Sequence, residues 1–280
     1  MSFLASASAW MRIPFAAFSF ACGGVQNAPK QSLVSFRDIP LCLATCWKAP
    51  KDLQAILSYE TSKYAVFGVA VVSIPEQPAA DQRAQSVREL LKRSIALKEK
   101  LMADHCERVV AMADICVDSL CKGGKLLLCG NGGSAADAQH LAAEMLVRLR
   151  PDVNRDGLPA IALTLDPSSM TACGNDYAFD VYFERMTRAL GRPGDVLIAI
   201  TTSGRSPNVI KALQAARQIG MKSLGLLGGN GGPALQECDL ALVVPSSETG
   251  RVQESHITIG HAMMELIEDG LIARKAIKHC

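Results

Sequence analysis

Aromatic residues are scarce in this sequence, and its positive and negative charges nearly cancel. Phe, Tyr and Trp make up 5% of the 280 residues, and 29 Lys and Arg against 27 Asp and Glu leave a formal net charge of +2. Nucleic-acid-binding proteins rely on basic patches and on aromatic rings that stack with bases, so we expect no nucleic-acid partner. The charge is also too small to favour an anionic membrane surface.

Paired cysteine motifs are absent as well. The chain has ten cysteines, but no two of them form a Cys-x-x-Cys pair. This absence argues against a cysteine-based metal site. A chain of this length can bury a core without disulfides, so we expect mostly buried, free thiols and a cytoplasmic protein.

Helix and strand patterns alternate through most of the chain. Apolar residues three and four apart predict two helices, or one broken helix, over residues 84–122, ended by Gly123 and Gly124. Apolar strand patterns then alternate with helical ones, and the sequence predicts helices over 175–190 and 251–275 among others. Strands that alternate with helices indicate the α/β class, with a five-stranded parallel sheet flanked by helices.

Two polar loops follow the first and third predicted strands, and each opens a helix. In parallel sheets, ligands bind beyond the carboxyl ends of the strands. Glycines let the backbone approach a ligand, helix N-termini attract anions, and hydroxyls donate hydrogen bonds. The sequence therefore predicts a monophosphate site. Its loops contain Gly130, Asn131, Gly132, Gly133 and Ser134, and Thr201, Thr202, Ser203, Gly204, Arg205 and Ser206.

The first loop has competing interpretations. Gly130, Gly132 and Ala135 fit a dinucleotide-binding fingerprint, with Asp166 as a partner for the ribose. That motif is weak by itself and gives the second loop no role. A Walker A loop is excluded because no Gly-Lys-Ser/Thr follows, whereas two tight turns without a ligand remain an alternative. We favour phosphate binding.

Histidines and carboxylates supply candidate chemistry nearby. His140 and Glu144 lie one helical turn apart, which suits metal ligation or acid–base work, although an exposed ion pair has the same spacing. On the last helix, His256 and His261 lie about 60° and about 80° to opposite sides of Gln253. Spacing alone does not choose between these two histidines.

Taken in order, these motifs resemble the phosphoheptose isomerases. The likeness rests on residues 130–144, 174–177, 191–213 and 251–261, and it extends over roughly residues 84–272. It implies a flavodoxin-like SIS domain with N-terminal helices and a cytoplasmic homotetramer. It also implies an aldose–ketose isomerase that converts sedoheptulose 7-phosphate to D-glycero-D-manno-heptose 7-phosphate for lipopolysaccharide precursors.

The resemblance also implies roles for individual residues. Glu144 and His261 match the family's base and acid, which favours His261 over His256. One zinc ion per subunit is implied, with the ligands His140, Glu144, Gln253 and His261. The implied substrate contacts are Asn131, Gly132, Gly133, Ser134, Glu144, Asn175, Asp176, Thr201, Thr202, Ser203, Ser206 and Gln253. The chain departs from the family at Thr201, where serine is usual, and at Arg205, where asparagine is common.

A binding protein is the main alternative to an enzyme. SIS domains also act as sugar-phosphate sensors, and one relative of these isomerases binds a replication initiator without catalysis. Such relatives are expected to lack the catalytic carboxylate, so Glu144, together with Gln253 and His261, favours the enzyme. A different sugar phosphate as substrate stays an open alternative.

Residues 1–80 differ in composition from the rest and fall outside the resemblance. Residues 13–22 are largely apolar and follow Arg12, but a membrane span needs roughly 20 residues. The run also fits the apolar part of a signal peptide. We expect residues 1–80 to be an extension that the fold does not need, residues 81–280 to form the SIS domain, and no membrane partner.

Overall fold

The computed structural model describes residues 64–67, 70–73 and 80–277. The chain divides into two compact units, residues 1–83 and 84–280. In the first unit, strand β1 (Tyr64–Phe67) pairs antiparallel with β2 (Ala70–Ser73). Most of the predicted extension, including residues 13–22, lies outside the described residues, and its lack of a structural role stays a prediction.

The second unit is built on a five-stranded sheet in which all neighbouring strands run parallel. The strand order is β4-β3-β5-β6-β7. This is the order of flavodoxin-like folds, so the predicted fold class is confirmed. The strands are β3 (Leu126–Gly130), β4 (Ala160–Ala162), β5 (Val196–Thr201), β6 (Lys222–Gly228) and β7 (Leu240–Val244).

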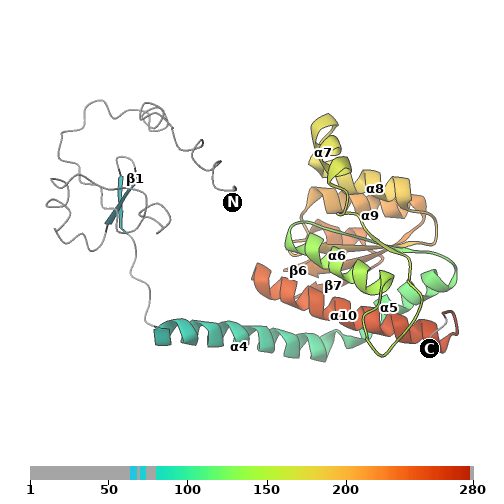
Figure 1. Cartoon of the computed structure of the whole chain (residues 1–280), viewed down its shortest axis with the longest axis horizontal. Helices are drawn as coiled ribbons and strands as arrows, with labels where there is room; N and C mark the ends of the chain where they lie inside the picture. Colours follow the sequence, from blue (N-terminus) through green and yellow to red (C-terminus); the bar gives the residue numbers. More distant parts are fainter. Residues whose placement is uncertain (1–63, 68–69, 74–79, 278–280) are drawn as a thin grey trace, which may run out of the picture. The chain divides into compact units, whose positions relative to one another are not determined.

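Helices cover both faces of this sheet (Figure 1). Every residue of β3 and β5 is buried, as expected of strands covered on both faces. Leu126 and Leu128 pack in the core on one face, whereas Leu127 and Cys129 pack in the core on the other. The first face is covered by α5 (Cys106–Cys121), α6 (Gly133–Leu146) and α10 (Thr249–Ala273), and the second by α7 (Pro167–Asp176), α8 (Tyr182–Leu190) and α9 (Pro207–Ile219).

The helix predicted over residues 175–190 is wrong in its first half, whereas its second half is α8. The structure has helix α7 ending at Asp176, then the 3-10 turn η1 (Phe179–Val181) and then α8. Helix α7 begins earlier because the Asp166 carboxylate accepts hydrogen bonds from the N–H groups of Ser168 and Ser169. Pro167 at the first helical position adds a second start signal. Because Asp166 caps this helix, it has a structural role that needs no ribose.

The remaining elements agree with the predicted alternation. Helix α4 (Ala80–Asp104) and α5 are two separate helices. Helix α9 is capped at its C-terminus by Gly220, whose φ of +86° a residue with a side chain rarely adopts. The 3-10 turn η2 (Pro233–Glu237) lies between β6 and β7. Within the described part of the chain, no helix is both long and apolar enough to cross a membrane.

Candidate metal and phosphate site

Three side chains from two helices meet at one point. The Nε2 atoms of His140 on α6 and His261 on α10 lie 2.8 Å apart, and His140 Nε2 lies 3.3 Å from Glu144 Oε1. One ligand atom from each of the three residues falls within a span of 4.8 Å. We call His140, Glu144 and His261 the histidine cluster. Two imidazoles and a carboxylate are donors that zinc and other divalent metals accept, so the cluster can hold a metal ion.

The structure separates the two histidines that spacing could not. His256 is fully buried, and its Nε2 lies 3.0 Å from the carbonyl oxygen of Leu227 on β6. Burial lowers the pKa of His256 to about 4, so its ring is neutral at physiological pH. His256 is therefore a core residue that ties α10 to the sheet, and His261 is the one that lies beside His140.

Gln253, the fourth ligand implied by the resemblance, touches the start of α6. A Cβ atom on Gly133 would lie 1.6 Å from Gln253 Nε2, so a side chain there would displace this amide. Gly133 is the first residue of α6 and belongs to the first loop. The structure thus places Gln253 against the loop that the sequence assigns to phosphate.

Asp137 faces the histidine cluster and was missed by sequence reasoning. It lies three residues before His140 and seven before Glu144, which is the same face of α6. Its side chain is buried, and Oδ2 has no hydrogen-bond partner among the described residues. Burial raises the pKa of the Asp137 carboxyl, and the proximity of His140 and His261 opposes this rise. The spacing was the only signal of Asp137 in the sequence.

The two polar loops lie side by side because they follow neighbouring strands. Strands β3 and β5 pair in parallel, so the loops leave the same edge of the sheet. The side chains of Asn131 and Asn208 exchange two hydrogen bonds of 2.9 and 2.8 Å, which join the first loop to α9. Asn208 is a second residue that sequence reasoning missed, because its partner lies 77 positions away.

Hydroxyls and tight backbone shape the second loop. Thr201 Oγ1 accepts a hydrogen bond from the Gly204 N–H at 3.2 Å and lies 3.3 Å from Ser206 Oγ. Ser203 Oγ accepts one from the Arg205 N–H at 3.2 Å. Gly204 has a φ of +64°, and a Cβ there would lie 2.0 Å from the backbone oxygen of Gly231. The loop therefore holds its hydroxyls at the start of α9.

Comparisons with known proteins agree with this arrangement. The SIS domain family matches residues 89–228. The phosphoheptose isomerase of Chlorobaculum parvum is 54% identical over 183 residues, which cover 65% of this chain and 88% of that protein. The chain belongs to the phosphoheptose isomerase family. The predicted resemblance is thereby confirmed.

Other phosphoheptose isomerases match over a similar extent. The protein of Roseiflexus sp. is 48% identical over 68% of this chain and 95% of its own length. The solved structure of the phosphoheptose isomerase GmhA from Neisseria gonorrhoeae is 43% identical, with a TM-score of 0.63, and covers 66% of this chain and 98% of that one. This chain therefore covers nearly the whole length of these two isomerases.

Two of the implied substrate contacts belong to neither polar loop. Asn175 and Asp176 end α7, and Asn175 Nδ2 donates to Asp176 Oδ1 at 2.8 Å. Asp176 lines a pocket of about 650 Å³ together with residues of α7 and α8, among them Arg185, whose guanidinium lies 4.1 Å from the centre of the Tyr177 ring. No residue of the two loops or of the histidine cluster lines this pocket.

Proposed function

We propose that this chain is an enzyme that isomerises sedoheptulose 7-phosphate to D-glycero-D-manno-heptose 7-phosphate, a precursor of lipopolysaccharide heptose. The observation that carries the proposal is the histidine cluster, in which a half-buried carboxylate, Glu144, lies beside two imidazoles. In this member of the phosphoheptose isomerase family, His140 and Glu144 follow the first polar loop on α6, and His261 joins them from α10. Such loops suit the phosphate, and the cluster suits the sugar.

Acid and base roles follow from the residue types. An aldose–ketose isomerisation needs a base that removes the proton from the carbon beside the carbonyl and returns it to the neighbouring carbon. Glu144 takes this role, because a carboxylate can carry the proton between the two carbons of the enediol. His261 moves a proton to or from the substrate oxygens, since a neutral imidazole can both donate and accept.

The proposal includes one zinc ion per subunit, held by His140, Glu144, Gln253 and His261. A carboxylate bound to zinc is a poorer base, because the metal stabilises its deprotonated form, so Glu144 would act as the base when it is not bound to the ion. The Nε2 atoms of His140 and His261 lie 2.8 Å apart, as in a hydrogen bond, whereas two nitrogens on one tetrahedral zinc lie roughly 3.3 Å apart, so the rings would separate slightly to hold the ion. When bound, zinc supplies a Lewis acid that polarises the carbonyl or hydroxyl of the sugar. A cation there would favour the charged form of Asp137, which lies behind the two histidines and whose pKa is raised by burial.

Removing hydroxyls from the second loop should weaken substrate binding rather than chemistry. In Ser203→Ala and Ser206→Ala, each variant loses one donor to the phosphate, which should cost about 1.5–3 kcal/mol and raise KM by roughly 10- to 100-fold. Steady-state kinetics measure this, with kcat expected within a few-fold of the parent. Ser246→Ala, beyond β7, is the control. If KM is unchanged in both loop variants, the phosphate binds elsewhere.

A homotetramer in the cytoplasm completes the proposal. Val87, Leu91 and Ile95 recur at four-residue spacing on α4, and each is more than half exposed. A groove of about 430 Å³ between α4, α5 and α10 is also mostly apolar, with Leu101, Val109 and others in its walls. Second copies of the chain would bury these surfaces. The six cysteines of the described residues are free thiols, which suits a reducing compartment.

Light scattering tests the oligomer and the extension together. The full chain should have the mass of four 29.8 kDa subunits, and a chain that starts at Ala80 should keep this assembly, its activity and its melting temperature. The physical reason is that α4, which carries the apolar stripe, begins at Ala80. A monomeric full chain would contradict the tetramer, and an insoluble shortened chain would show that the extension supports the fold.

A further inference from the structure

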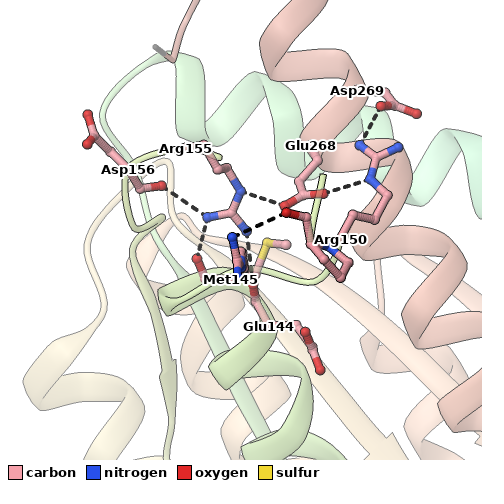
Figure 2. A network of polar contacts seen from close by, with 9 residues as sticks. Glu144, Met145, Arg150, Arg155, Asp156, Glu268 and Asp269 are labelled. Atoms are coloured by element: carbon pink, nitrogen blue, oxygen red, sulfur yellow. Dashed lines mark hydrogen bonds and ion pairs between the residues drawn. The ribbon is translucent and has the colours of Figure 1, made fainter. Parts of the chain in front are cut away.

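A buried arginine connects the two helices that carry the histidine cluster. Arg155 lies between α6 and β4, and its side chain is fully buried (Figure 2). Its Nε donates to the Glu268 carboxylate on α10 at 2.6 Å. Its Nη2 donates to the backbone oxygen of Glu144 at 2.9 Å, and Nη1 donates to those of Met145 at 2.9 Å and Asp156 at 3.0 Å.

These contacts act at the end of α6, where carbonyl groups lack helical partners. The last four carbonyls of a helix need other donors, and a cation there also meets the negative end of the helix dipole. Arg155 supplies hydrogen-bond donors and a positive charge to the turn that contains Glu144. The same guanidinium bonds Glu268, which follows His261 by seven residues, or two turns, on α10. One rigid group therefore spans from the backbone of Glu144 to the helix of His261.

We propose that Arg155 is a positioning residue that fixes α6 against α10, and so holds His140, Glu144 and His261 within reach of one metal ion. The inference rests on the proposed function for its metal. Arg155 lies outside the histidine cluster, but the alignment of the metal site depends on it. Contacts to the ligating side chains themselves typically change metal affinity by about 10- to 100-fold when they are removed. Arg155 bonds the backbone of one ligand, so we expect an effect near the lower end of that range.

Arg150 provides a matched control within the same network. Its guanidinium donates to Glu268 at 3.0 Å and to Asp269 at 2.6 Å, both on α10 (Figure 2). These two bonds involve no backbone group of α6. Arg150 and Arg155 thus share the Glu268 carboxylate, but only Arg155 connects it to Glu144. Glu268 also keeps a charged partner when either arginine is changed alone.

The test compares Arg155→Lys with Arg150→Lys, using Co²⁺ alone as the probe in metal-free full-length protein. Lysine keeps the charge but cannot reproduce the planar fork that reaches four acceptors. In Arg155→Lys, the cobalt affinity should fall about tenfold or more, and its visible absorption band should change, at a temperature where the protein is folded. In Arg150→Lys, both should stay within about twofold of the parent.

A double variant separates alignment from stability. Arg155→Met with Glu268→Met replaces the buried ion pair by apolar side chains, a change that often restores stability. The melting temperature should recover while the cobalt affinity stays low. Unchanged cobalt binding in Arg155→Lys, equal losses in Arg150→Lys, or recovery of affinity with melting temperature would each overturn the proposal. A parent protein that takes up no cobalt would overturn it together with the metal site, whereas the isomerase assay judges the activity separately.

Discussion

Replacing Glu144 with glutamine is expected to lower kcat for sedoheptulose 7-phosphate by about 10²- to 10⁴-fold, the usual contribution of a general base. The amide keeps the size and hydrogen-bonding shape of the side chain but cannot take up a proton. Glu144 is 17% exposed and stands in an i, i+4 pair with His140, so the fold should tolerate the change. Kinetics by NMR, with circular dichroism to check folding, measure the effect.

Glu184→Gln is the control for this variant. Glu184 is also a half-buried carboxylate in an i, i+4 pair, with Arg188 on α8 at 3.0 Å, and it lies on the opposite face of the sheet from α6. Its loss should leave kcat within about twofold, since a surface ion pair contributes little. If Glu144→Gln were as active as Glu184→Gln, the base would have to be another group.

The second large effect concerns the two histidines of α10. His261→Ala removes the ring whose Nε2 lies 2.8 Å from that of His140, and it should lose both bound metal and activity. His256→Ala should instead keep both, because His256 is a core residue bonded to the Leu227 carbonyl. That variant should lose about 1–3 kcal/mol of stability, since the carbonyl is left without its partner.

Elemental analysis of protein purified without chelator, together with thermal melting, distinguishes the two histidine variants. The parent and His256→Ala should contain about one zinc per chain, the number that one four-ligand site holds, and His261→Ala should contain close to none. A result in which His256→Ala loses the metal and His261→Ala retains it would show that the histidine cluster is wrongly composed.

The sequence predicts well what short-range patterns determine. Buried runs such as residues 126–130 indicated the strands, and the Gly- and Ser-rich loops indicated which strand ends meet. The pair of His140 and Glu144 was visible because one helical turn separates them. Helix α7 was missed although Asp166 and Pro167 form a start signal, because its apolar pattern is weak.

Long-range packing explains what the sequence could not predict. The roles of His256 and His261 depend on which face of α10 packs against β6. Residue spacing does not contain that information. No pattern in the sequence singled out Arg155, because its carboxylate partner Glu268 lies 113 positions later. Asp137 gains its role only when α6 and α10 meet at the histidine cluster, and Asn208 only when α9 meets the first loop.

The isomerisation itself tests the central claim most directly. Purified protein is incubated with sedoheptulose 7-phosphate in D₂O, with and without added zinc, and followed by NMR. The account predicts signals of D-glycero-D-manno-heptose 7-phosphate, with deuterium at the carbon beside the carbonyl, because the proton on Glu144 exchanges with solvent. Absence of product and of deuterium under both conditions, from protein that still binds the sugar phosphate, would contradict the account and indicate a sugar-phosphate-binding protein without catalysis.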